Sequence, residues 1–203
     1  MCRWMLLAFS FLCFGSMATA EEGAAAALAK LRDLAGDWEG SFQWTGARSA
    51  SGKMNASYYV TGGGSAVIEN LIVDGAPIMT SAYHLDGTDL RVTHYCAAQN
   101  QPRLSASRID IAQGILDFAF VDITNLRSPD SPHVVGLELR LLTADHVIVT
   151  FLFEGAGKRS RERIELKRLP KKNMSWFSVP NNTRGGRGWF SPGVRECHRA
   201  ISS

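Results

Sequence analysis

Three short motifs that identify common enzymes are missing from this chain of 203 residues. It contains no G-x-S-x-G nucleophile elbow, no C-x-x-C pair and no glycine-rich P-loop. His84, His94, His133 and His146 are too scattered to form a recognisable zinc motif. The sequence therefore names no reaction, and it assigns no catalytic residue, no metal site and no cofactor.

Cysteine is also scarce, with four residues in the whole chain. Cys2 and Cys13 fall within a segment that we expect to be removed, which leaves Cys96 and Cys197. An oxidising compartment would allow these two to form a disulfide, although their spacing alone does not establish one. The alternative is that Cys96 is a buried apolar residue of the core, and both readings stay open.

Long apolar runs are limited to the start of the chain. Met1-Cys-Arg3 is a short basic opening, Trp4–Phe14 is apolar, and Ala18-Thr-Ala20 has small residues at the cleavage positions. This pattern predicts a signal peptide over residues 1–20, cut after Ala20, and hence a periplasmic or secreted protein. The run is shorter than the roughly 20 residues of a transmembrane helix, and no later segment is long and apolar enough to span.

Positive charge is concentrated at the other end. Residues 21–170 carry 15 Lys/Arg and 18 Asp/Glu, whereas residues 171–203 carry six Lys/Arg and one Asp/Glu. The last segment follows Pro170 and lacks periodicity, so we predict a loosely ordered basic tail over 171–203. Because the preceding region is slightly acidic, nucleic-acid binding by it is not indicated.

Between these two ends the pattern indicates a short helix followed by strands. Over residues 21–36, Leu28, Leu31 and Leu34 recur at helical spacing before Gly36, which we expect to end the helix near one end of a barrel. From Trp38 the period changes to two, which is typical of a strand with one buried face.

Strand signals then recur every 8–12 residues and are joined mostly by tight turns, with no helical crossover. The predicted strands are 38–45, 53–61, 66–73, 77–85, 89–97, 103–111, 115–121, 134–142, 146–154 and 161–169. Sequential hairpins make neighbours antiparallel, and closing the sheet removes exposed edges. We therefore predict an all-β, ten-stranded, up-and-down antiparallel barrel over residues 37–170, with a two-sheet sandwich as the alternative.

Closure of such a barrel pairs the first strand with the last. The start of the first strand then meets the end of the tenth, which brings Trp38 close to Arg168. Arg168 shares its side of the strand with Ile164 and Leu166, so both residues are expected to face the core. A guanidinium stacked on the indole there would contribute about 0.5–2 kcal/mol.

These same residues carry a resemblance to a known family. Gly36-Asp-Trp38 after a short helix resembles the G-x-W signature of lipocalins and the wider calycin group, and Arg168 matches the arginine that packs across that tryptophan. The span Gly36–Gly40 is also similar to the opening of nitrobindin-like haem barrels. Residues 28–169 look like a group of exported bacterial lipocalin-like proteins without an assigned activity, in which segments like His94–Arg103 and Asp122–Leu126 recur. The resemblance implies a barrel whose cavity opens at one end and takes an apolar or amphipathic ligand.

Candidate ligand-binding residues come from the strands and from one rim. His94 and Cys96 share the face of Leu90 and Val92, so they should point inward, and Tyr58 belongs to the expected cavity wall or core. The loops after strands 89–97, 115–121 and 146–154 should meet at one end, because those strands run the same way. Residues gathered on that rim would be Asn100, Gln101, Arg103, Asn125, His133, Lys158 and Arg159. The alternative role for these polar groups is to tie the loops down.

Three hypotheses of function follow. The first is an exported barrel that binds a small apolar or amphipathic ligand. The second is a haem or metal barrel that uses His94, with His133 or His146 as alternatives, since imidazole suits both haem iron and metals. The third, which the sequence supports least, is an enzyme in the barrel mouth with His94 or His133 as general base.

Overall fold

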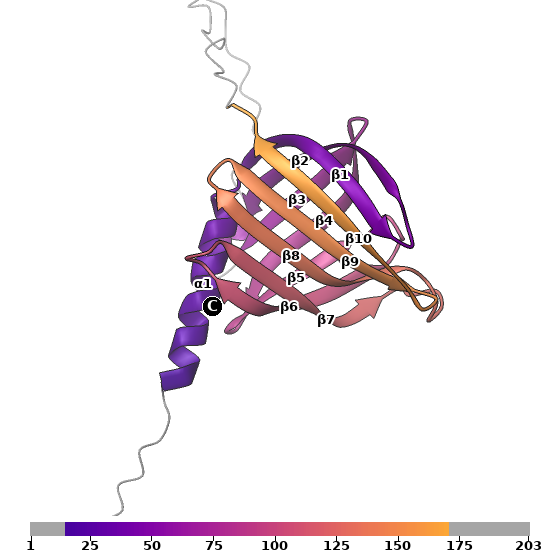
Figure 1. Cartoon of the computed structure of the whole chain (residues 1–203). Helices are drawn as coiled ribbons and strands as arrows, with labels where there is room; N and C mark the ends of the chain where they lie inside the picture. Colours follow the sequence, from indigo (N-terminus) through magenta and orange to yellow (C-terminus); the bar gives the residue numbers. More distant parts are fainter. Residues whose placement is uncertain (1–14, 171–203) are drawn as a thin grey trace, which may run out of the picture. The chain divides into compact units, whose positions relative to one another are not determined.

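The computed structural model describes residues 15–170 of the chain. These residues form a closed antiparallel barrel of ten strands with one α-helix at its side, as Figure 1 shows. The elements are α1 (Gly15–Arg32), β1 (Gly36–Gly46), β2 (Ala50–Thr61), the 3-10 turn η1 (Gly62–Gly64), β3 (Ala66–Val73), β4 (Ala76–Asp86), β5 (Asp89–Tyr95), β6 (Gln101–Asp110), β7 (Ile115–Thr124), β8 (His133–Thr143), β9 (His146–Gly155) and β10 (Lys158–Arg168).

The predicted fold class is confirmed, and the strands lie close to their expected ranges because hairpin turns bound them clearly. Consecutive strands pair throughout, and β1 closes the barrel by pairing with β10. The helix differs in extent: α1 begins at Gly15 and ends at Arg32, and a turn then leads to β1. Residues 1–14 of the expected signal peptide, the basic tail 171–203 and Cys197 lie outside the described residues.

The β1–β10 seam is held at one end by Trp38 and Arg168, which face each other across the two strands. The Cζ atom of Arg168 lies 4.3 Å from the centroid of the Trp38 ring, the arrangement that strand parity predicts. Gly36 has a φ of +136°, and a side chain there would meet the Arg168 guanidinium. Gly40 lets the strands approach, since a Cβ atom would lie 1.8 Å from the Glu165 carbonyl oxygen.

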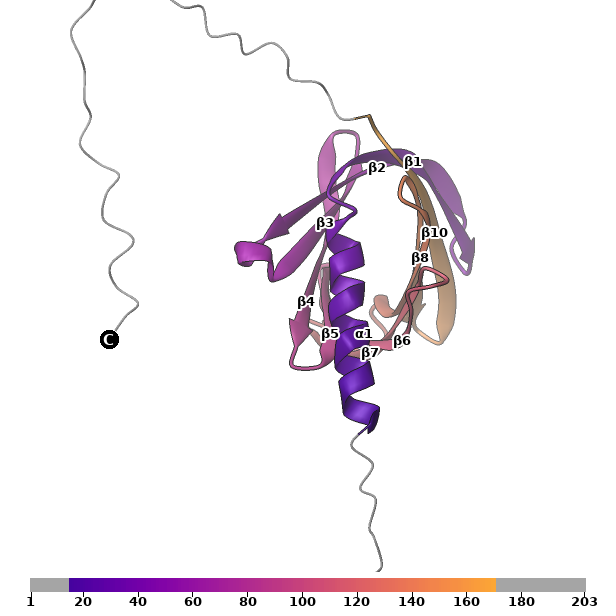
Figure 2. The same cartoon turned by 90° about the vertical axis from the view of Figure 1, so that its left-hand side faces the viewer.

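Helix α1 lies across one end of the barrel, as Figure 2 shows. It contacts β2 to β6, and its inner face buries Ala24, Ala27, Leu28 and Leu31. The adjoining turn is fastened to β1 because the Trp38 indole N–H donates to the Leu34 carbonyl, at 2.9 Å. No helix within residues 15–170 combines the length and hydropathy that a membrane crossing needs.

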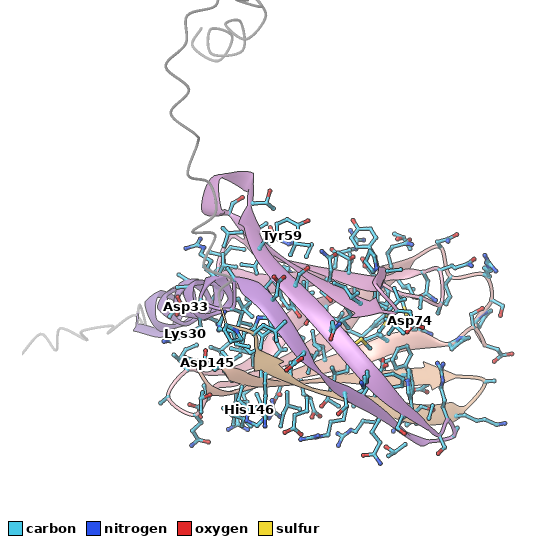
Figure 3. All side chains as sticks on the ribbon, turned by 90° about the horizontal axis from the view of Figure 1, so that it is seen from above. Lys30, Asp33, Tyr59, Asp74, Asp145 and His146 are labelled. Carbon is cyan, nitrogen blue, oxygen red and sulfur yellow. The ribbon has the colours of Figure 1, made fainter. Side chains whose placement is uncertain are left out.

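The opposite end of the barrel is formed by the connections between β1 and β2, β3 and β4, β5 and β6, β7 and β8, and β9 and β10. Figure 3 shows Asp74, in the β3–β4 turn, far from Asp33 and Asp145, which lie at the helix end. The barrel interior is filled by alternate side chains of every strand, including Leu71, Leu104, Leu137 and Ile164. The end opposite α1 is less completely filled, and it holds the cavity described next.

Candidate functional site

A cavity of about 640 Å³ occupies the barrel end opposite α1. Its wall is largely apolar, and its larger apolar side chains are Phe42, Trp44, Met54, Val73, Ile78, Met79 and Phe153. They come from β1, β2, β3, β4 and β9, so the cavity extends across the barrel. Cavities of roughly 300–1,000 Å³ with mostly apolar walls are typical of small-molecule sites.

One carboxyl group interrupts this apolar wall. Glu162 lies on β10 at the inward-facing parity of Ile164, and its side chain lines the cavity although only 3% of the residue is exposed. Its Oε2 atom is buried without a hydrogen-bond partner. Burial raises the pKa of Glu162 to about 7, against the opposing effects of the Arg48 cation and the Trp44 indole. At neutral pH the cavity therefore contains an acid that is close to half ionised.

This carboxyl group should make the stability of the barrel depend on pH. The pKa of Glu162 is 4.5 when solvated and about 7 in the folded chain. Between these values the folded chain binds more protons, so stability falls as pH rises from 4.5 to 7 and is constant above. We expect Glu162→Gln to raise the free energy of unfolding at about pH 8 by about 3 kcal/mol, because the amide carries no buried charge.

Urea denaturation at several pH values, followed by circular dichroism, measures this effect. Glu39→Gln is the matched control, because Glu39 is exposed on the outer face of β1. Its pH profile should coincide with that of the unmodified chain. If the free energy of unfolding changed with pH equally in Glu162→Gln and in the unmodified chain, Glu162 would be solvated in the cavity.

Aromatic side chains form the wall beside Glu162. Trp44 is the cross-strand partner of Glu162, and its ring lies 4.8 Å from that of Phe153, centroid to centroid. The Arg48 guanidinium lies over the same indole, with Cζ 4.1 Å from the ring centroid. Arg48 itself is exposed, so its cation lies at the rim of the cavity, whereas the carboxyl group of Glu162 lies within it.

A second group of buried polar side chains lies deeper in the barrel. Tyr58, Glu69, Ser81 and His94 are successive cross-strand partners on β2, β3, β4 and β5, and we call them the polar row. The Tyr58 hydroxyl donates to Glu69 Oε1 at 2.5 Å, and the Tyr83 hydroxyl donates to Glu69 Oε2 at 3.1 Å. Burial raises the pKa of Glu69, and bonds from Tyr58, Ser81 and Tyr83 act against it. Both carboxyl oxygens of Glu69 are thus satisfied within the barrel.

His94 ends the polar row and does not line the cavity. Its Nδ1 atom shares a hydrogen bond with the Ser81 hydroxyl at 3.0 Å, and its Nε2 atom is buried without a partner. The ring lies 4.5 Å from that of Phe151, and burial lowers the pKa of His94 to about 3. His94 is therefore neutral at physiological pH, and a haem or metal on it would have to displace the side chains that bury it.

Of the three ligand-binding residues that were predicted on strands, His94, Cys96 and Tyr58, Cys96 alone lines the cavity. It lines the cavity wall two residues beyond His94, where burial raises the pKa of its thiol. Tyr58, by contrast, lies in the polar row and is not part of the wall. The suggested pairing of Cys96 stays a prediction, because Cys197 lies outside the described residues.

Two of the predicted rim residues, Asn100 and Asn125, join two loops at the cavity end. Asn100 is buried, and its Nδ2 atom donates to the Pro132 carbonyl at 3.0 Å. Asn125 has a φ of +58° and donates to the Gln99 carbonyl at 2.5 Å. These bonds connect the segment after β5 with the segment between β7 and β8. The two asparagines therefore hold the wall that carries Pro132, a residue of the cavity lining.

Two further predicted rim residues, Arg103 and His133, make local contacts. Arg103 is exposed and forms a two-pronged ion pair with Asp122, at 2.5 and 2.6 Å. His133 is half-buried, and its Nδ1 atom lies 2.9 Å from the Ser131 carbonyl oxygen. Neither residue lines the cavity. Among residues 15–170 no group of three His, Cys, Asp or Glu side chains is placed to hold a metal ion.

Glu69, Glu162 and Ser81 belong to no recognisable motif, although strand alternation places all three inward. Glu69 shares its side of β3 with Val67 and Leu71, and Glu162 shares its side of β10 with Ile164. A charged residue at an inward position of an alternating strand is the signal that would have identified both. Trp44 lies on the same side of β1 as Trp38 and is part of the cavity wall.

Neither a protein-family model nor a curated protein matches the chain. Several solved structures are similar to it. One is a protein of unknown function of the DUF3598 family from Nostoc punctiforme, at 13% identity and a TM-score of 0.47, covering 68% of this chain and 49% of that one. Another is Rv2717c from M. tuberculosis, at 14% identity and a TM-score of 0.45, covering 71% of this chain and 98% of that one. A third is EF1p2_mFAP2b bound to DFHBI, at 10% identity and a TM-score of 0.35, covering 72% of this chain and 98% of that one.

These likenesses concern the fold alone. The chain spans about half the length of the Nostoc protein.

Proposed function

We propose that the barrel binds a small, largely apolar molecule in the cavity opposite α1, and that it does so in the periplasm or outside the cell. The observation that carries the proposal is the cavity itself, about 640 Å³ with a mostly apolar wall. Interiors of closed barrels of this size are commonly filled by side chains, so space of this volume is a feature to be explained. The export part of the proposal is supported by the signal pattern of residues 1–20.

The arrangement of the two barrel ends supports a binding role. α1 covers one end, so a ligand would enter past the turns at the other, where exposed residues such as Ala47, Arg48 and Ala50 border the cavity. Two loops of that end are joined by Asn100 and Asn125, which keeps the wall in place without a ligand. A pre-formed apolar cavity lowers the ordering cost of binding. Lipocalin-like barrels, which the G-x-W segment resembles, use their interiors in this way.

Filling the cavity should abolish binding. Val73 lines the cavity, whereas its neighbour Ile72 does not. We expect Val73→Trp to weaken the binding of Nile red, an uncharged dye that fluoresces in apolar sites, by at least about tenfold. Ile72→Trp places the same indole outside the cavity and should leave the affinity unchanged. Fluorescence titration of the purified chain measures both.

Two results would count against this proposal. One is that the folded, unmodified chain gives no Nile red signal, which would mean that the interior is closed to ligands. The other is that Val73→Trp and Ile72→Trp bind the dye equally well while circular dichroism shows both folded, which would place the dye on the outer surface. Organic extraction of the purified chain followed by mass spectrometry should, if the proposal holds, release a lipid-like molecule.

A further inference from the structure

We propose that the ligand carries a cationic amine, and that Glu162 binds this group while the apolar wall of the cavity binds the rest of the molecule. This inference rests on the proposed function and adds the chemical class of the ligand. It follows from a carboxyl group that lines an apolar cavity, that is almost wholly buried, and that has an oxygen without a hydrogen-bond partner.

The contrast between the two buried glutamates supports this assignment. Glu69 is as deeply buried as Glu162, but two tyrosine hydroxyls donate to its two carboxyl oxygens. The barrel therefore satisfies an interior acid fully where that acid belongs to the core. Glu162 Oε2 has no such donor. A buried acceptor without a partner is unfavourable, so its presence in a cavity wall is explained if a ligand supplies the donor.

A protonated amine is the donor that fits best. It supplies both hydrogen-bond donors and a positive charge. A hydrogen bond between two ionised groups is stronger than one between neutral groups. Among the described residues Glu162 forms no ion pair. The titratable groups whose electrostatics are linked to it are the Arg48 guanidinium at the rim and the Cys96 thiol in the same cavity wall. A ligand ammonium group would therefore not compete with an internal partner.

Arg48 is the one feature that would favour an anion instead. Arg48 is an exposed residue that borders the cavity, and its guanidinium stacks on the Trp44 ring. The field of an exposed charge is screened by water and salt, whereas an interaction within a partly buried site is about fourfold stronger at equal distance. Glu162 should therefore decide the sign of the ligand head group, and Arg48 should act at the entrance.

Competition between three ten-carbon molecules tests the inference. Decylamine, decanol and decanoate, each below its micelle-forming concentration, are used to displace Nile red from the purified chain. At about pH 8 we expect decylamine to bind at least about tenfold more tightly than decanol, and decanoate to bind most weakly. Near pH 5.5 the amine should lose this advantage, because Glu162, with a pKa of about 7, is then protonated.

Two variants show whether Glu162 is responsible. Glu162→Gln keeps the shape of the side chain, and it should abolish the preference for decylamine over decanol. Glu154→Gln removes the same charge from the outer side of β9 at the same end, where Glu154 pairs with Arg159, and it should keep the preference. An amine preference that is absent, or that survives in Glu162→Gln, would overturn the inference while the cavity still binds dye and decanol. If Nile red and decanol fail to bind at all, the proposed function is wrong, and this inference falls with it.

Discussion

Replacing Arg168 with methionine should lower the free energy of unfolding by about 3–5 kcal/mol. The guanidinium lies over the Trp38 ring, with 17% of the arginine side chain exposed. It also donates hydrogen bonds to carbonyl oxygens on both sides of the barrel seam, those of Asp33, Leu34, Ala35 and Ala144. Methionine fills much of the same space but supplies no donor, so several of these carbonyls lose their partner.

The loss should reach the helix as well as the sheet. Asp33, Leu34 and Ala35 form the turn between α1 and β1, and Arg168 holds this turn against the end of β10. Without the guanidinium the covering of that barrel end by α1 is weakened. Arg168→Lys should be intermediate, because lysine keeps the charge but cannot reach several acceptors with one planar group.

Urea denaturation followed by far-ultraviolet circular dichroism measures this prediction. Lys167→Met is the matched control, because Lys167 is the exposed neighbour of Arg168 on the outer face of β10. It should change stability by less than about 0.5 kcal/mol. An Arg168→Met chain as stable as the unmodified one would show that strand pairing alone closes the seam.

Replacing Glu69 with alanine should also destabilise the barrel by about 3–5 kcal/mol. The change leaves two buried tyrosine hydroxyls, of Tyr58 and Tyr83, without the acceptor they share. It also leaves an empty space in the middle of the barrel, since Glu69 is fully buried. Both effects act in the same direction, because the folded state loses hydrogen bonds and packing that water cannot replace there.

Glu69→Gln separates the two effects. Glutamine fills the same space and keeps an oxygen that accepts one tyrosine hydrogen bond, while its amide donates to the other hydroxyl oxygen. We expect it to destabilise the chain by less than about 1.5 kcal/mol. Denaturation midpoints of both variants, and of Tyr58→Phe alone and combined with Glu69→Gln, measure the coupling. The prediction is wrong if Glu69→Ala and Glu69→Gln unfold at the same urea concentration as the unmodified chain.

The interior thus has two acids with different roles. Glu69 is held by Tyr58 and Tyr83 and connects β2, β3 and β4 in the core. Glu162 faces the cavity, lacks a partner for one oxygen and should destabilise the chain above neutral pH. A group that lowers stability without a structural partner is characteristic of functional sites, where stability is exchanged for binding.

Alternation and turn residues were sufficient to predict the barrel. Period-two alternation and the recurring turns predicted ten strands and their direction. Trp38 and Arg168 predicted the closing pair. Much less of the site was predictable. Cys96 reached the cavity wall, but His94 and Tyr58 point inward at a deeper level, in the polar row. The rim residues Asn100 and Asn125 fasten loops, as the alternative reading had it.

By itself the sequence determined which side of each strand faces inward, because side chains alternate along a strand and this property is local. Only the tertiary structure decided at what depth each inward side chain lies, since depth depends on the register between strands far apart in the chain. The pairing of Trp44 with Glu162, and the alignment of Tyr58 with Glu69 and of Ser81 with His94, follow from that register. Whether space remained inside was likewise a property of all ten strands together, because a cavity is the volume that their side chains leave unfilled.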